Sequence, residues 1–567
     1  MRKPRATKGV KCMRPRPHNI LFAGLGAVIA ATSQVPAAEK VFNLEEATIA
    51  DIHDAMSAGA LSAEKLVELY MVRIAAYDRA GPRLNSIIAI NPDAKAEAAA
   101  LDKERATKGP RGPLHGIPVL LKDNVDVAKM PTTNGSAVMK DAIPPEDGAV
   151  TKALRAAGAV ILGKAAMGEF AGGSYNSVRG QTLNPYNLKR ATGGSSSGSG
   201  AAISANFAVL AVGTDTSTSV RGPAAYTGIV GLRPTTGLVT RAGVAPKNLN
   251  FDSAGPMART VTDVALMMNV LAFADPDDPK SIEAWGELKK RNAKSGGVVD
   301  FTQTLDRGSL KGRKLGVLRD LFKGDPEISA LAEKALATMR ELGATLVDIN
   351  LEPSFIETHL GGGLRKMRDL SDYRFRSDWE EYLKRFNSPS VPRTVAEFIR
   401  IYDAEVSQSP LPVEASVMNL LRTSMKRSTD APEYKDFIEN LMPRSTAEKL
   451  AVFEKFGVDA LVHPYVPTFA VPITNPVYKI DDPTFVKSEA PVPATMAGYS
   501  SVGFPSIVVP MGFGSVGLPM SIAIFGKPYE DRQIIGFAYA YEQATKLRRP
   551  SKLVPPVPGE SITYQSK

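Results

Sequence analysis

Short apolar runs of strand length alternate with helical patterns along most of this chain, and this alternation restricts its fold more than any other feature. Strand-like runs occur at residues 117–121, 159–162 and 209–212, and helical patterns occur at 149–157 and 201–207. The pattern continues with expected strands at 228–232, 314–318, 345–349, 460–463, 506–510 and 520–525, and an expected helix at 531–547. Strands without a polar face are typical of sheets that helices cover. The sequence therefore predicts an α/β protein with a large, mostly buried mixed β-sheet.

The N-terminal residues have the pattern of an export signal. A basic stretch is followed by the apolar run 20–31 and by small residues up to Ala38. That run is too short to span a bilayer, which takes about 20 residues, and its flanks are typical of a secretory signal peptide. We predict a signal peptide over residues 1–38, an exported (periplasmic or secreted) mature protein over residues 39–567, and no stable membrane insertion after cleavage. A buried N-terminal helix or an uncleaved anchor is the alternative, and Met13 is an alternative start.

Most of the formal positive charge lies in this predicted signal. The whole chain carries +10, and without the seven Lys and Arg residues among residues 1–18 the formal charge falls to +3. A charge this small on a chain this long does not indicate a polyanionic partner. The sequence therefore predicts no nucleic-acid partner.

Cysteine and histidine usage excludes two classes of chemistry. The only cysteine, Cys12, precedes the apolar run, so the predicted mature protein has neither a thiol nor a disulfide. Cysteine catalysis is therefore excluded. The five histidines are His18, His53, His115, His359 and His463. No two of them have the i, i+4 spacing of a helical zinc site, so no metal site and no cofactor are predicted.

Two loops rich in hydroxyl groups are the candidates for chemistry. Residues 192–200 form a Gly/Ser-rich stretch before an apolar helical pattern, and residues 213–219 follow a buried strand. A serine nucleophile needs a base, and no histidine is close in sequence to either loop. Lys122 ends another apolar run. The local pattern favours a surface position for Lys122, but a buried lysine has a lowered pKa and its neutral amine can accept a proton near pH 7.

These segments resemble the motifs of the amidase-signature family. The matching stretches, in chain order, are residues 115–123, 193–199, 213–223, 231–235, 255–259 and 517–526. The resemblance covers about residues 50–270 and 455–545 and leaves a segment of about 354–445 as an insertion. It implies an amidase-signature fold, with a large mixed sheet flanked by helices on both faces and a mainly helical insertion or cap.

The resemblance also implies a role for each matching residue. Ser219 is the expected nucleophile, Ser195 the bridging serine after a cis peptide bond, and Lys122 the base. The expected oxyanion hole consists of the backbone N–H groups of Thr216, Ser217, Thr218 and Ser219. The residues expected to support these loops are Ser196, Asp215 and Arg221.

One departure from the family pattern lies directly before the expected nucleophile. The family has Gly-Gly where this chain has Ser217-Thr218. The N–H groups survive this change, but β-carbons enter a turn in which glycine can adopt a positive φ. Ser217 also becomes an alternative attacking hydroxyl.

Three functions are compatible with these motifs. The first is hydrolysis of a carboxylic amide C–N bond in a peptide amide, an aryl or alkyl amide, or a related carbamate or ester; the stretch 180–186 and the export signal are similar to bacterial peptide amidases. The second is the catalytic subunit of a tRNA-dependent amidotransferase, which an exported location disfavours. The third is a non-catalytic binding protein, which has no need of Lys122, Ser195 and Ser219. The expected partner is a small amide or peptide-amide substrate, in a pocket lined by Gly172, Gly173, Tyr175, His463, Tyr465 and the insertion.

Overall fold

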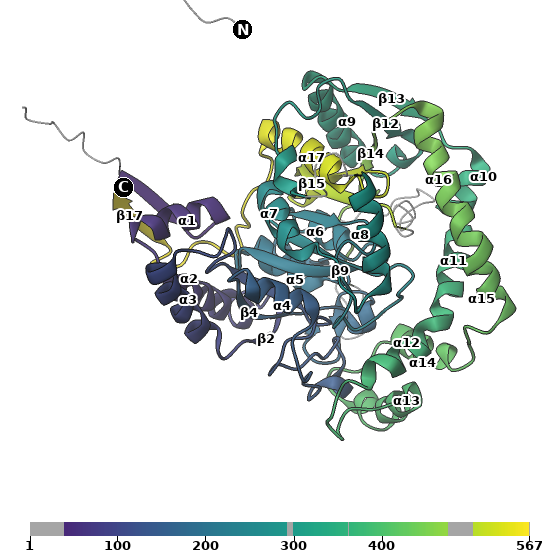
Figure 1. Cartoon of the computed structure of the whole chain (residues 1–567), viewed down its shortest axis with the longest axis horizontal. Coiled ribbons are helices and arrows are strands. Elements are labelled where there is room, and N and C mark those ends of the chain that lie inside the picture. The colour runs from purple at the N-terminus through teal and green to yellow at the C-terminus, as the bar shows by residue number, and fades with distance from the viewer. Residues whose placement is uncertain (1–38, 292–298, 361, 474–502, 566–567) are drawn as a thin grey trace, which may run out of the picture. The chain divides into compact units, whose positions relative to one another are not determined.

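Apolar strands, most of them buried on both faces, assemble into one eleven-stranded sheet at the centre of the protein. The computed structural model describes residues 39–291, 299–360, 362–473 and 503–565 (Figure 1). The strand order across the sheet is β13-β12-β14-β16-β15-β10-β11-β9-β3-β4-β2. In that order the strands are Thr345–Ile349, Lys314–Leu318, Ala460–Pro464, Pro519–Phe525, Ser506–Phe513, Val230–Arg233, Ser253–Ala258, Leu210–Asp215, Pro118–Lys122, Val160–Ala165 and Ile87–Ile90.

The sheet is mixed, as the sequence predicts. Strand β3 runs parallel to both of its neighbours, β4 and β9, whereas β11 pairs antiparallel with β9 and with β10. Parallel neighbours end at the same edge of a sheet. The last residues of β3 and β9, Lys122 and Asp215, therefore lie at one edge, where the loops of the candidate site begin.

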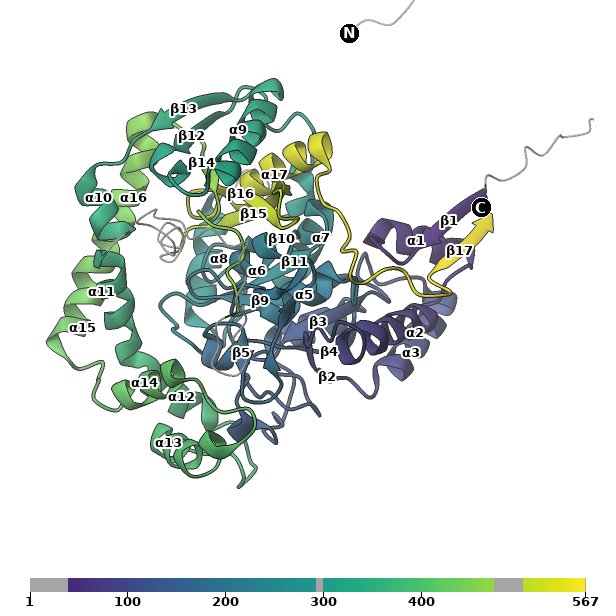
Figure 2. The same ribbon diagram turned by 180° about the vertical axis from the view of Figure 1, so that it is seen from behind.

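Helices cover both faces of this sheet (Figures 1 and 2). The helices that pack on its strands are α3 (Ala94–Lys108), α4 (Ala149–Ala156), α5 (Ser197–Ser204), α6 (Arg221–Tyr226), α7 (Val261–Leu271), α9 (Pro326–Glu341) and α17 (Asp531–Thr545). The same part of the chain also forms α1 (Ile49–Ala58), α2 (Ala63–Ile74), which packs on α3, and α8 (Pro279–Arg291). At the starts of α1, α2, α7 and α9, a side chain accepts a hydrogen bond from a backbone N–H group that has no partner within the helix. Ser62, for example, accepts from Lys65 N at 3.0 Å at the start of α2.

The predicted insertion is a run of helices with its own aromatic core. It contains α10 (Pro353–His359), α11 (Gly362–Ser371), α12 (Phe375–Leu383), α13 (Val395–Ala404), α14 (Ala415–Ser424) and α15 (Pro432–Asp436), and α16 (Met442–Phe456) leads back to the sheet (Figure 1). Phe170, from the sheet-bearing part of the chain, packs edge-on against Trp379 and Phe398, with ring centroids 4.9 and 5.7 Å away. Such aromatic pairs add to the free energy gained from area burial. The insertion is therefore anchored to the segment that carries Phe170.

The two ends of the described chain meet in a small separate sheet. Strand β1 (Glu39–Asn43) pairs antiparallel with β17 (Ser561–Gln565). Two further two-stranded sheets join β5 (Tyr175–Asn176) to β6 (Gly180–Gln181) and β7 (Leu183–Asn184) to β8 (Asn187–Ala191). The predicted signal peptide lies outside the described residues. Within the described ranges, every helix is too short or too polar to cross a membrane.

Candidate active site

Lys122 is the last residue of β3, and its ammonium group points into the protein. The local pattern favours a surface position, and this expectation is wrong, because the side chain is completely buried. Its Nζ lies 2.8 Å from Ser195 Oγ, 2.8 Å from Thr214 Oγ1 and 3.1 Å from Thr214 O. Burial lowers the pKa of Lys122 to about 7. In a large fraction of the molecules the Lys122 amine is therefore uncharged at neutral pH.

Ser195 lies in the Gly/Ser-rich loop between β8 and α5. The peptide bond between Gly194 and Ser195 is cis. The carbonyl of Ser195 accepts a hydrogen bond from Gly168 N at 3.1 Å. A β-carbon on Gly194 would clash with the backbone of Gly173, so only glycine allows the two loops to approach this closely.

Ser219 lies in the second loop, between β9 and α6, and hydrogen bonds join this loop to the first. Ser196 N donates to Ser219 O at 3.1 Å. The Ser196 hydroxyl lies 3.2 Å from both Thr214 N and Thr214 O, at the end of β9. Ser196 therefore supports both loops, as the resemblance implies, and Ser195 and Ser219 line the same cavity.

A buried ion cluster lies beneath the second loop. Asp215 is 3.1 Å from Arg221 Nε and 3.1 Å from Arg233 Nη1, and all three side chains are fully buried. Burial alone would raise the pKa of Asp215, but the charges of Arg221 and Arg233 hold it well below its usual range. Arg221 also donates to the carbonyl of Ser217. The cluster therefore fixes the backbone directly before Ser219.

The backbone from Thr216 to Ser219 accommodates the replacement of Gly-Gly by Ser217-Thr218. None of these four residues, all of which the structure describes, has a positive φ. The Thr216 hydroxyl donates to Asp252 at 2.6 Å, which holds the start of this stretch. Side chains at these positions are therefore compatible with an oxyanion hole made of backbone N–H groups.

The two serines open into a cavity of about 450 Å³. Gly172 and Gly173 line it, as predicted, together with Gly194 and residues 216–219. Its lining also contains residues that the sequence motifs do not indicate, namely Lys247, Asn248, Phe251, Arg368 and Asp372. Arg368 lies in α11, so the helical insertion forms part of this cavity.

Three predicted pocket residues lie outside the lining of this cavity. The Tyr175 hydroxyl donates to Pro412 O at 2.9 Å, and His463 is buried in β14, where it stacks on Phe525 at 4.9 Å. Tyr465 is also buried and packs under the guanidinium of Arg221, 5.6 Å from the ring centroid. None of these three side chains is among the described residues that line the cavity beside Ser219.

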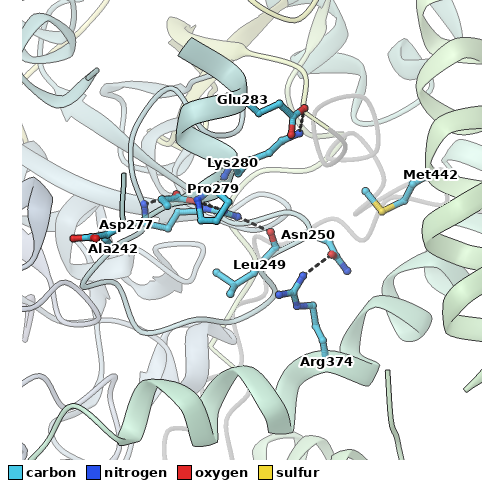
Figure 3. Close-up of a pocket in the computed structure, with 11 residues that line it drawn as sticks. Ala242, Leu249, Asn250, Asp277, Pro279, Lys280, Glu283, Arg374 and Met442 are labelled. Atoms are coloured by element: carbon cyan, nitrogen blue, oxygen red, sulfur yellow. Dashed lines mark hydrogen bonds and ion pairs between the residues drawn. The ribbon is translucent and has the colours of Figure 1, made fainter. Parts of the chain in front are cut away.

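A second cavity, of about 510 Å³, is lined in part by Leu249 and Asn250 (Figure 3). In the sequence these two residues lie between Asn248 and Phe251, which line the first cavity. Charged side chains that line the second cavity form ion pairs. Arg241 pairs with Asp278 at 2.5 Å, and Lys280 pairs with Glu283 at 2.7 Å. The described residues of its lining include no Ser, Thr or Tyr that could act as a nucleophile, so we assign the chemistry to the cavity beside Ser219. The described residues contain no cluster of three or more His, Cys, Asp or Glu side chains that could hold a metal ion.

Comparisons with known proteins agree with this geometry. Residues 65–535 match the family model described as amidase. The native peptide amidase of Stenotrophomonas maltophilia is 35% identical, with a TM-score of 0.79 over 90% of this chain and 99% of that one. A subunit of the glutamyl-tRNA(Gln) amidotransferase of Geobacter metallireducens is 33% identical over 88% of this chain and 98% of its own length. A probable amidase of Arabidopsis thaliana is 31% identical over 94% of this chain and 97% of its own length. The chain therefore belongs to the amidase-signature family.

Proposed function

We propose that this protein hydrolyses a carboxylic amide C–N bond through an acyl-enzyme on Ser219. The observation that carries the proposal is the buried contact of 2.8 Å between Lys122 Nζ and Ser195 Oγ. A neutral lysine has two N–H groups and one lone pair. The two oxygens of Thr214 can accept both N–H groups, which leaves the lone pair for the hydroxyl proton of Ser195.

In the proposed reaction, Ser219 Oγ attacks the amide carbon while its proton passes to Ser195, whose own proton passes to Lys122. The N–H groups of residues 216–219 stabilise the oxyanion, each by about 3–4 kcal/mol where such donors have been removed in other enzymes. The relay then reverses, the C–N bond breaks, and the amine leaves with the returned proton. Water attacks the acyl-enzyme through the same relay and releases the carboxylic acid.

A peptide amide is the substrate that the similarity to the Stenotrophomonas maltophilia peptide amidase favours; aryl and alkyl amides and related carbamates or esters are the other members of the class. The similarity to the glutamyl-tRNA(Gln) amidotransferase protein favours a second candidate, release of ammonia from glutamine for a partner protein. The predicted export of residues 39–567 supports the independent hydrolase, since tRNA charging is cytoplasmic.

The full-length protein is expected to release ammonia or amine from at least one member of a small panel. The panel contains a C-terminal peptide amide, an anilide, a short aliphatic amide and glutamine. After rapid acid quenching, intact-mass measurement should show an added acyl group. Digestion and peptide mapping should then place this group on the peptide that contains Ser219. Hydrolysis of glutamine alone would favour the amidotransferase, and the absence of any turnover or acyl adduct would contradict amide hydrolysis.

Restoring the family's glycines tests the unusual Ser217-Thr218 pair. Because the backbone N–H groups remain and neither residue has a positive φ, Ser217→Gly with Thr218→Gly should change kcat/KM by less than about fivefold. Two added glycines increase the entropy of the unfolded chain, so the free energy of unfolding should fall by about 1–2 kcal/mol. Urea unfolding and amide hydrolysis measure the two quantities. A loss of activity of more than about 100-fold would show that one of these side chains takes part in the reaction.

A further inference from the structure

The described residues that line the cavity beside Ser219 include more cationic than anionic side chains. Among the described residues that line it, the ionisable side chains are Lys247, Arg368 and Asp372. They come from two parts of the chain, since Lys247 lies in the loop between β10 and β11, and the other two lie in the insertion. Among the described lining residues, two cations therefore stand beside one carboxylate.

Lys247 is fixed close to the loop that carries the nucleophile. One carboxylate oxygen of Asp252 accepts from the backbone N–H groups of Lys247 and Asn248, each at 2.8 Å. The other oxygen accepts from the Thr216 hydroxyl at 2.6 Å. The ammonium group of Lys247 lies 5.3 Å from the centroid of the buried Phe375 ring, a cation–π contact.

The negative charge of Asp372 acts on both Lys247 and Arg368, and all three side chains line the cavity. Burial lowers the pKa of Lys247, and the charges of Asp372 and Asp252 oppose that shift. Burial also lowers the pKa of Arg368, and the charges of Asp372 and Asp215 oppose it. Arg368 and Ser219 line the same cavity, so the charge of the guanidinium acts on the space beside the nucleophile.

Holding two cations in a partly desolvated cavity costs free energy that an anion can offset. We propose that the substrate carries a carboxylate near the scissile amide and that Lys247 and Arg368 bind it. This proposal rests on the proposed function. Over the described lining residues the charges sum to one positive unit, which a single carboxylate matches and a dianionic phosphate would exceed. Arg368 can also bind a carboxylate through two parallel hydrogen bonds.

Matched substrate pairs test the proposal on both sides of the amide. On the acyl side, glutaryl para-nitroanilide is compared with butyryl para-nitroanilide and γ-aminobutyryl para-nitroanilide. On the amine side, para-acetamidobenzoate is compared with para-acetamidotoluene. In at least one series, kcat/KM should be about 10–100-fold higher for the carboxylate than for its neutral partner, and the ratio should fall as salt is added.

Substitutions then assign the preference to the two cations. Lys247→Met and Arg368→Gln should each lower kcat/KM for the carboxylate substrate more than for its neutral partner, so that the ratio of the two kcat/KM values falls toward one. Lys280→Met, in the second cavity (Figure 3), is the matched control and should keep the preference. Lys247→Glu should shift the preference toward the γ-aminobutyryl substrate. A lysine with only a structural role would lower the rates for all substrates equally.

Two outcomes separate this proposal from the proposed function. Equal turnover of charged and neutral substrates in both series overturns carboxylate recognition and leaves amide hydrolysis standing. Turnover of none of them overturns amide hydrolysis of this class. In that case, binding to the Ser219→Ala protein still decides the charge preference, because calorimetry should show tighter binding of the carboxylate member than of its neutral partner.

Discussion

Ser219→Ala is expected to lower kcat for amide hydrolysis by at least about four orders of magnitude, because the variant has no nucleophile with which to form the acyl-enzyme. The variant should fold, since only one oxygen atom is lost and the Asp215 cluster that fixes the loop remains. Activity is measured on the amide that the wild-type protein hydrolyses, and folding is checked by thermal unfolding.

Ser217→Ala is the matched control for this experiment. Ser217 lies in the same loop, two residues earlier, and its carbonyl is held by Arg221. The control should keep most of the activity, because its N–H group remains. If Ser217→Ala were inactive and Ser219→Ala active, Ser217 would be the nucleophile.

Lys122→Met is expected to lower kcat/KM by about three to four orders of magnitude, since general-base catalysis contributes up to that factor. The wild-type pH profile should reflect the same group. Lys122 must be neutral to accept a proton, and burial lowers its pKa to about 7. Activity should therefore rise with pH to a plateau above about pH 7, and it should be about 100-fold below the plateau two pH units under that pKa.

If Lys122 is the base, Lys122→Met should abolish the dependence of activity on the titration of this group. The residual activity of Lys122→Met should be nearly constant between about pH 5 and 8, apart from the slow rise due to hydroxide. Lys122→Arg is the charge-retaining control and should be inactive as well, because its guanidinium does not lose a proton in this range. A profile that falls with rising pH, or one that the substitution leaves unchanged, would exclude Lys122 as the base.

The sequence predicted the class of fold and the chemistry-bearing loops better than it predicted the cavity. The alternation of strands and helices predicts a mixed, buried sheet, and the motif resemblance places Lys122, Ser195 and Ser219 together. The burial of Lys122 was not predictable from local pattern, because the residues that surround it, such as Thr214, come from a strand about 90 positions later.

The pocket residues that belong to no sequence motif were either not predicted or predicted at the wrong place. His463 lies near the end of β14 and Tyr465 directly follows it, a position typical of pocket residues, but both side chains are buried where β14 packs beside β16. Lys247 and Arg368 have no local pattern that distinguishes them from surface cations. Only the folding of the insertion against the sheet brings the two into one cavity.

The pairing of β1 with β17 has a consequence for biosynthesis. Asn43 and Ser561, which are joined by a hydrogen bond of 2.7 Å, are 518 positions apart in the chain. At roughly 5–20 residues per second of translation, β1 waits about half a minute to two minutes for its partner strand to leave the ribosome. During that interval its edge is open, and open edges are templates for pairing with other chains. A product truncated before residue 561 would keep this open edge permanently, so ribosome stalling near the end of the message would yield chains prone to aggregation, even though every catalytic residue had already been made.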